Sequence, residues 1–194
     1  MRFLIPLCLL FIMNLTCAFA QETGYVIKAD NDTVICNIRS TGVGGYKWKT
    51  AAESEWHSVA GMKEFHLNQS NITYQRKTLP DTTTAFLKVL EKGKISLYEY
   101  LQVYPSITGS DVIKHWYASK GNTTRVQEIK SNHMSNSTRN NPEQVLFKML
   151  KDQPAVLANF RKKEYTFDKI RSTIHFYNTG QALPYTAAEP EDEN

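Results

Sequence analysis

The spacing of apolar residues changes once along the chain, and this change constrains the fold more than any other feature of the sequence. From Gly24 to about Ile129, apolar and polar residues alternate in short segments separated by turn residues, as in β-strands. Over 141–180 the apolar residues recur at helical spacing instead. Strands followed by helices predict an α+β fold. We expect an N-terminal antiparallel β-meander, either open or curled toward a half-barrel, with two or three C-terminal helices packed on it.

Three hairpins are expected in the β-rich part. Asn, Asp and Gly tolerate left-handed backbone angles, and they mark the turns at 30–32, 91–94 and 119–122. In the second of these turns Gly93 is expected to supply a positive φ.

The strand that follows the second turn has apolar or aromatic residues on both faces. Side chains alternate along a strand, so Ile95 and Leu97 point one way. Tyr98 and Tyr100 point the other way. This pattern predicts a central strand that is covered on two sides.

The helical part carries its own start and stop signals. Asn141 is expected to be the N-cap of the first helix, with Gln144 placed to complete a capping box. Pro154 ends or restarts this helix. A further helix is expected between a cap at Thr166 and Gly180 just beyond its end.

The first twenty residues have the pattern of a secretory signal peptide. Arg2 precedes an apolar run over 3–15, and small residues at 18 and 20 form a cleavage site before Gln21. The apolar run is shorter than the roughly 20 residues that cross a bilayer, and no second such run follows. We expect a periplasmic or extracellular protein. Anchoring through a lipidated Cys17 is the alternative, although Thr16 fits the lipidation motif poorly.

Beyond the signal, the pattern predicts one domain over 21–186, β-rich over 21–130 and helical over 141–180. The acidic residues 187–194 are expected to be a disordered tail. The formal net charge is +4, and the basic residues are scattered. We expect no nucleic-acid partner, because such a partner requires a denser basic stripe.

Cys36 is the one cysteine that follows the signal segment. A single cysteine cannot close an intramolecular disulfide, so packing must hold this domain together. Cys36 alternates with Val34 and Ile38 in a strand pattern, and we interpret it as a small buried residue.

Motifs for catalysis or metal binding are absent from the sequence. The five histidines occur at no zinc-ligand spacing, and there is neither a nucleophile elbow nor a calcium loop. We therefore expect no catalytic residue, metal or cofactor, and whether the chain is an enzyme stays open. The histidines are His57, His66, His115, His133 and His175.

Aromatic residues provide the candidate binding site. Exposed Trp and Tyr side chains on a β-rich scaffold bind sugars, peptides or proteins, whereas buried ones fill the core. Trp48 and Trp56 have charged neighbours in the sequence, and we expect them to be partly exposed. The candidate binding residues are Tyr46, Trp48, Trp56, Trp116 and Tyr117.

The order of these segments resembles that of small exported proteins of Bacteroidota. The segments that carry the resemblance are 24–38, 86–98, 151–157 and 164–178. Members of this group often have a cysteine before the final helices, where this chain has Gln153. The resemblance implies an exported α+β protein and no particular reaction.

Three functions are compatible with these observations. The first is a non-enzymatic cell-envelope module that binds a protein or glycan partner. The alternative is a small hydrolase that acts on envelope polymers, and it requires a histidine beside a buried carboxylate in a cleft. The third is a purely structural or stress-response component of the envelope, which predicts neither a cleft nor an exposed aromatic patch. The oligomeric state does not follow from the sequence.

Overall fold

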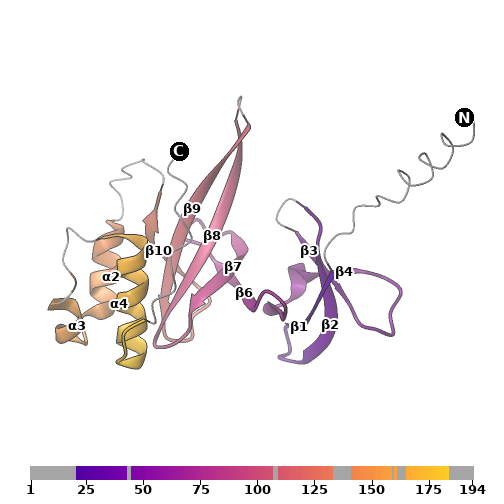
Figure 1. The fold of residues 1–194 in the computed structure, drawn as a ribbon, viewed down its shortest axis with the longest axis horizontal. Coiled ribbons are helices and arrows are strands. Elements are labelled where there is room, and N and C mark those ends of the chain that lie inside the picture. Colours follow the sequence, from indigo (N-terminus) through magenta and orange to yellow (C-terminus); the bar gives the residue numbers. More distant parts are fainter. Residues whose placement is uncertain are drawn as a thin grey trace, which may run out of the picture. The chain divides into compact units, whose positions relative to one another are not determined.

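The computed structural model describes residues 21–42, 45–106, 109–132, 141–158, 160 and 165–183. It confirms the α+β class, with antiparallel strands followed by helices (Figure 1). The chain forms two compact units that divide between Thr73 and Tyr74. The expected signal peptide and acidic tail lie outside the described residues, and the single domain over 21–186 stays a prediction.

The first unit is an antiparallel sheet with the strand order β5-β1-β2-β3-β4. The turn between β1 and β2 is the expected one: Asn31 has a φ of 73°, and the Asp30 carboxylate accepts a hydrogen bond from the Asp32 amide at 3.0 Å. The elements are β1 (Gln21–Ile27), β2 (Thr33–Ser40), β3 (Tyr46–Lys49), β4 (His57–Ser58), the 3-10 helix η1 (Val59–Gly61) and β5 (Glu64–Leu67).

One face of this sheet is buried. Val26, Ile38 and Phe65 have no exposed surface. Cys36 is buried among the apolar residues, as expected. On the opposite face Ile35 is 75% exposed, so the strand alternation of the sequence separates a core face from an outer face.

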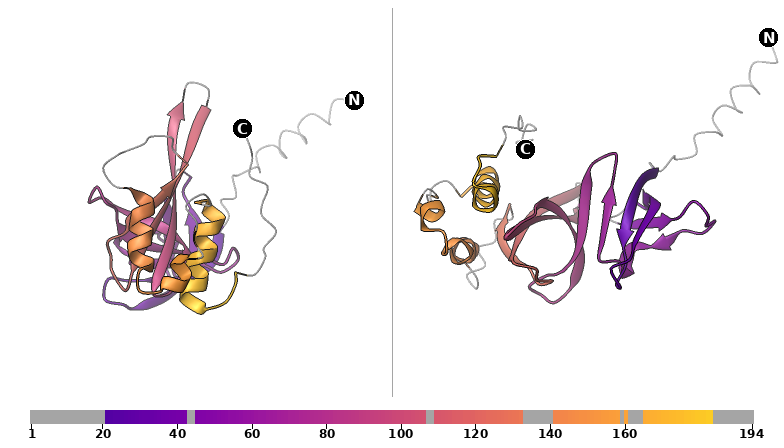
Figure 2. Two further views of the ribbon diagram at one scale, coloured as in Figure 1. Left: turned by 90° about the vertical axis from the view of Figure 1, so that its left-hand side faces the viewer. Right: turned by 90° about the horizontal axis from the view of Figure 1, so that it is seen from below.

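The second unit contains a meander in the order β6-β7-β8-β9-β10, whose curl Figure 2 shows. The end of β6 meets the segment before β10, because the Thr78 amide donates to the Thr124 carbonyl at 2.9 Å and the Val126 amide donates to the Thr78 carbonyl at 3.0 Å. The sheet is therefore curled but not closed along its length. The strands are β6 (Ile72–Thr78), which begins in the first unit, β7 (Thr84–Glu91), β8 (Ile95–Ser106), β9 (Gly109–Lys120) and β10 (Gln127–Ser131).

Strand β8 is covered on both faces near its start, as predicted. Ile95 and Leu97 belong to the core cluster that includes the helices. Tyr98 belongs to a second cluster on the other face, where Tyr100 packs against it. The second unit thus has two apolar clusters, one on each side of its sheet.

The helices are α2 (Pro142–Leu150), α3 (Pro154–Ala158) and α4 (Phe167–Thr179), and they lie against one face of the sheet (Figures 1 and 2). The caps of α4 are as predicted: Thr166 accepts from the Lys169 amide, and Gly180 has a φ of 74°. Asn141 is the N-cap of α2, as predicted, but the capping hydrogen bond expected of it is wrong. Its side chain makes no such bond, and α2 begins with Pro142, whose fixed φ suits the first position.

Two details of the predicted hairpins are also wrong. Gly93 does not have a positive φ. A Cβ atom at Gly93 would lie 2.5 Å from Cγ of Asn178, so glycine is required there by the close approach of α4. The strand that returns after the third expected turn, at 119–122, begins later than this turn implies, because β10 begins at Gln127.

Candidate functional site

Three of the five candidate binding aromatics are buried. The exposed fractions of Trp48, Trp116 and Tyr117 are 7%, 6% and 6%. The prediction that Trp48 is partly exposed is wrong, because it is on the core face of β3, opposite Ile38. Tyr46 and Trp56 are half-buried, and the Tyr46 ring packs on Phe65 at 4.8 Å between centroids.

Trp116 and Tyr117 are consecutive residues of β9 and point to opposite faces. The Trp116 indole donates to the Glu99 carboxylate at 3.1 Å and its ring packs edge-on against Phe167. Tyr117 belongs to the inner cluster of the curled sheet. Burial raises the pKa of the Tyr117 hydroxyl well above its ordinary range, and the charge of Glu128 adds to this shift. Both rings have structural roles.

Two cationic side chains lie over the ring of Trp56. The guanidinium carbon of Arg39 lies 4.2 Å from the centroid of the Trp56 ring, and Nζ of Lys49 lies 5.1 Å from it. Trp56 is therefore the candidate aromatic whose surroundings differ most from those of a core residue.

Each described histidine contacts a polar partner of its own. His57 lies 3.5 Å from the exposed Glu53, and His66 bonds to the Thr73 hydroxyl at 2.8 Å. His133 lies outside the described residues. No group of three His, Cys, Asp or Glu side chains in the described part of the chain can hold a metal ion.

Two histidines bond to a glutamate, which is part of the arrangement that a hydrolase requires. Nδ1 of His175 lies 3.0 Å from Oε2 of Glu91, a carboxylate that is 12% exposed and also pairs with Arg171. The second histidine is His115. Its Nδ1 lies 2.9 Å from Oε1 of Glu128, and its Nε2 is buried without a hydrogen-bond partner among the described residues. The side chain of Glu128 is 36% exposed, so this carboxylate is not a buried one. The pair therefore has the histidine–carboxylate hydrogen bond that a hydrolase requires, but its carboxylate is not buried.

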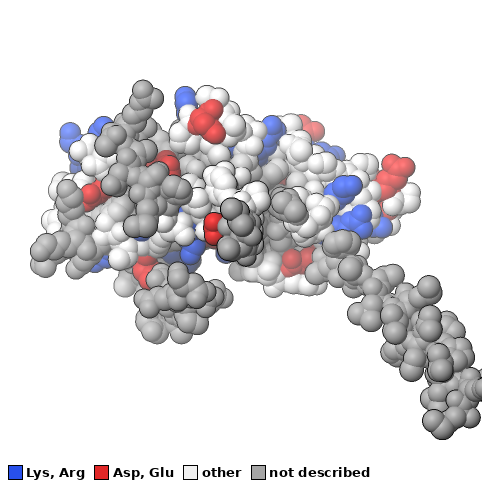
Figure 3. All heavy atoms as spheres, turned by 90° about the horizontal axis from the view of Figure 1, so that it is seen from above, with Lys and Arg blue, Asp and Glu red and all other residues white. Residues whose placement is uncertain are grey.

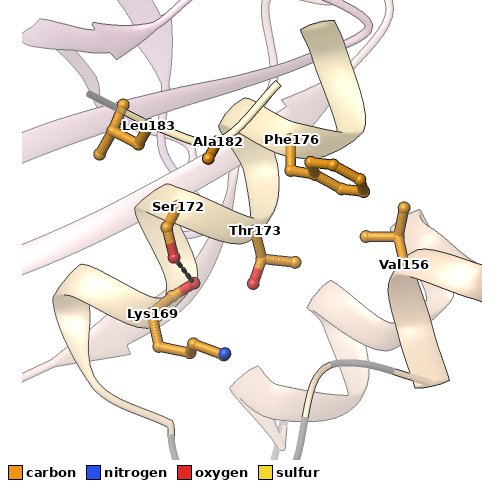
Figure 4. Close-up of a pocket in the computed structure, with 7 residues that line it drawn as sticks. All are labelled: Val156, Lys169, Ser172, Thr173, Phe176, Ala182 and Leu183. Atoms are coloured by element: carbon orange, nitrogen blue, oxygen red, sulfur yellow. Dashed lines mark hydrogen bonds between the residues drawn. The ribbon is translucent and has the colours of Figure 1, made fainter. Parts of the chain in front are cut away.

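A pocket of about 300 Å³ lies in the helical part of the second unit (Figure 4). Its lining is mainly apolar, and the Ser172 hydroxyl at its wall donates to the Lys169 carbonyl at 3.0 Å. None of its lining residues is a carboxylate or a histidine, so it brings no acid–base pair together. The lining residues are Val156, Lys169, Ser172, Thr173, Phe176, Ala182 and Leu183.

The β8–β9 hairpin extends beyond its neighbouring strands (Figure 1). Pairing of β7 with β8 ends at Lys88 and Glu99, and pairing of β10 with β9 ends at Ser131 and His115. Asn132 still bonds to the backbone of Lys114, and beyond it the described residues of the hairpin form a two-stranded ribbon of 101–106 and 109–113. We call this ribbon the arm.

The arm carries most of the exposed large apolar residues of the described chain. Leu101, Val103 and Val112 are 52%, 55% and 49% exposed. They share one face, because Leu101 and Val103 alternate along β8 and Val103 pairs directly with Val112. Tyr104, on the other face, is 41% exposed. This surface was not predicted from the sequence, although the unusual length of both strands was a signal for it.

Charged residues of both signs lie on the face of the molecule shown in Figure 3. On the face shown in Figure 3, the described Lys and Arg side chains are interspersed with Asp and Glu and form no continuous stripe.

Comparisons with protein-family models, with curated proteins and with solved structures find no match to this chain. Among the described residues, no helix is long and apolar enough to cross a membrane.

Proposed function

We propose that this chain is an exported cell-envelope protein that binds a partner protein through its β8–β9 arm. The observation that carries the proposal is the cluster of half-exposed aliphatic residues on the arm, Leu101, Val103 and Val112. Isolated exposed apolar residues are normal on protein surfaces, whereas a contiguous group of them marks an interaction site.

The arm is suited to an extended segment of a partner, which would add a strand to it. A free strand edge presents unpaired backbone N–H and C=O groups, and peptides bind to such edges by main-chain hydrogen bonds. The β9 edge from Ser110 to Ile113 contains no proline. The β8 edge contains Pro105, which cannot donate a hydrogen bond, so β9 is the better edge.

The apolar face supplies the affinity that an added strand alone lacks. Covering a half-exposed Leu or Val stabilises a complex by about 1 kcal/mol for each side chain. The three aliphatic residues lie on one face, so one partner segment with alternating apolar residues contacts all of them.

A photo-crosslinking residue at position 103 tests the proposal in envelope extract. We expect one defined protein to be cross-linked, and we expect the product to disappear when the same probe is placed in the L101T/V112T background. Threonine retains the preference for strand structure while removing apolar surface. The matched control is the same probe at Ile35, an equally apolar residue that is 75% exposed on the first unit. Equal cross-linking from both positions would contradict the proposal.

Export rests on the pattern of residues 1–20 and is tested separately. The N-terminal residue of the chain recovered from the cell envelope is expected to be Gln21. A chain that begins at a diacylglyceryl Cys17 would replace the proposed periplasmic or extracellular location with a lipid-anchored one.

The hydrolase alternative is supported by the hydrogen bond between His115 and Glu128, because Glu91, the partner of His175, is already paired with Arg171. If His115 acts as a base, the protein releases soluble fragments from purified envelope polymer, and His115→Ala abolishes this release. Release that is equal in the wild type and in the variant would exclude this pair as the site.

A further inference from the structure

Three cations lie side by side on the outer face of β2 and β3 in the first unit. Arg39 lies directly opposite Lys47, and Lys49 follows two residues later on the same face. Lys47 is exposed, and the other two side chains are half-buried. Like charges that face each other across strands destabilise the pairing, so this arrangement has a cost in the free protein.

The ring of Trp56 orders two of these cations. Arg39 and Lys49 both lie within cation–π distance of it, at 4.2 and 5.1 Å from the ring centroid. A side chain held in this way loses less conformational freedom when it binds an anion, which favours binding. Trp56 therefore holds the charges in place for a ligand.

No carboxylate among the described residues lies within 4.0 Å of these three cations. The neighbouring Glu53 is engaged elsewhere, since it accepts from the amide and the hydroxyl of Thr50, both at 2.9 Å. By contrast, Lys28 in the same unit pairs with Asp32. Among the described residues, the charge on β2 and β3 is thus left without a carboxylate partner.

We infer that Arg39, Lys47, Lys49 and Trp56 form a binding site for an acidic polysaccharide. A guanidinium binds the two oxygens of a carboxylate or sulfate group together, and the lysines add charge at neighbouring positions along the strand. Positions two apart on a strand are about 6.6–6.8 Å from each other. The site therefore presents cations in a row to a polymer with repeated anionic groups. Asn37, opposite Lys49, adds an amide for sugar hydroxyls.

This inference rests on the proposed export of the chain, which brings it to envelope glycans, but not on the arm. A protein whose arm binds no partner can still bind the polysaccharide. The experiments therefore test the partner protein of the arm and the polysaccharide site independently.

Isothermal titration of the chain from Gln21 onward with polygalacturonate tests the inference, with heparin as a sulfated probe and dextran as a neutral one. We expect binding to the two acidic polymers and none to dextran. The R39Q/K49Q variant is expected to bind at least about tenfold more weakly. The matched control, K28Q/K63Q, removes the same charge from the same unit and is expected to change the affinity by less than about twofold.

Several outcomes would overturn the inference. The first is that K28Q/K63Q weakens polymer binding as much as R39Q/K49Q does. The second is binding to dextran, and the third is no binding to either acidic polymer. The fourth is stronger binding to phosphatidylglycerol vesicles than to both polymers. The last outcome would identify a membrane-surface site in place of a glycan site. Binding to heparin alone would restrict the ligand to sulfated glycans.

Tryptophan fluorescence gives a second measurement that requires no polymer. Trp48 and Trp116 are 7% and 6% exposed, so an ionic quencher in water reaches mainly Trp56. We expect the anion iodide to quench it more than the cation caesium does, because the site concentrates anions. This preference should disappear in R39Q/K49Q and persist in K28Q/K63Q. Equal quenching by the two ions in the wild type would contradict the inference.

Discussion

The two units use the same strand pattern to build different cores. In the first unit the sheet buries one face, with Val26 and Phe65 inside and Ile35 75% exposed on the other side. In the second unit the sheet buries both faces, with Leu97 beneath the helices and Tyr98 in the inner cluster. A sheet with one free face can present polar and charged groups there. A sheet that is covered on both faces has to present its binding surface elsewhere, and here it does so on the arm.

The difference predicts that the second unit is the more sensitive to loss of apolar volume. Leu97 has no exposed surface and lies in the cluster that joins β8 to the helices. Leu97→Ala is expected to lower the free energy of unfolding by about 2–5 kcal/mol, because it removes packed methyl groups and leaves a cavity. Urea denaturation followed by far-UV circular dichroism measures this change.

The control for this substitution lies on the same strand and face. Leu101 is 52% exposed on the arm, and Leu101→Ala is expected to change the free energy of unfolding by less than about 0.5 kcal/mol. Equal losses for the two variants would mean that the arm is packed in solution, which would remove the basis of its proposed role.

The first unit is expected to be most sensitive at a point of close backbone approach. A Cβ atom at Gly24 would lie 1.9 Å from the backbone oxygen of His66, so Gly24→Ala must push β1 and β5 apart. We expect a loss of about 1–3 kcal/mol, measured in the same urea experiment. Gly61→Ala is the control, because a Cβ atom there would meet no atom within 4 Å. Faster amide hydrogen exchange at Phe65 and Leu67 would localise the effect to β5.

Features that depend on neighbouring residues in the chain were predictable from the sequence. The order of strands and helices, the two faces of β8 and the caps of α4 at Thr166 and Gly180 follow from spacing and local backbone preference. Features that depend on distant residues were not predictable. Gly93 is required because Asn178 packs on it from 85 positions away, and no local pattern contains that information.

The candidate site shows the same limit. Trp48 and Trp56 have similar polar neighbours in the sequence, yet the structure buries the first on the core face and surrounds the second with Arg39 and Lys49. The difference comes from register: Trp48 pairs with the buried Ile38. The arm was missed for a related reason, since alternation alone does not tell whether a neighbouring strand is present.

Cys36 makes it possible to observe the first unit by itself. Burial raises the pKa of its thiol to about 11. At pH 8 roughly 0.1% of the native thiol is ionised, against roughly a quarter of an unfolded thiol with an ordinary pKa near 8.5. Labelling by a maleimide or a disulfide reagent is therefore expected to be more than about 100-fold slower in the native protein. Labelling at the rate of a free thiol would contradict the burial of Cys36.

The sign of the associated pH dependence follows from the same shift. The folded thiol has the higher pKa, so its contribution to stability is fully present below the pKa of the unfolded thiol. It is lost as the pH rises from about 9 toward 11. Cys36→Ala is expected to flatten the decline of the urea midpoint over that range.

Labelling of Cys36 also tests whether the chain unfolds as one domain. If the units unfold together, Leu97→Ala in the second unit accelerates labelling of Cys36 in the first by the factor that corresponds to its loss of stability. If they unfold separately, labelling in Leu97→Ala proceeds at the wild-type rate. The second result would replace the single predicted domain with two.

The smallest expected effect concerns the polar contacts that join the helical part to β9. The Asp152 carboxylate accepts hydrogen bonds from Lys120 at 2.7 Å and from the Tyr177 hydroxyl at 2.8 Å. The bonds from Lys120 and Tyr177 lower the pKa of Asp152 below its ordinary value. The folded state has the lower pKa, so the contribution to stability is present above the unfolded value near 3.9 and is lost as the pH falls through the folded value.

We expect Asp152→Asn to lower the urea midpoint slightly at pH 6 and to make no difference near pH 2. Because the pair is exposed to solvent, 1 M NaCl should reduce the difference at pH 6. A difference that is the same at both pH values would show that Asp152 acts through packing and not through its charge.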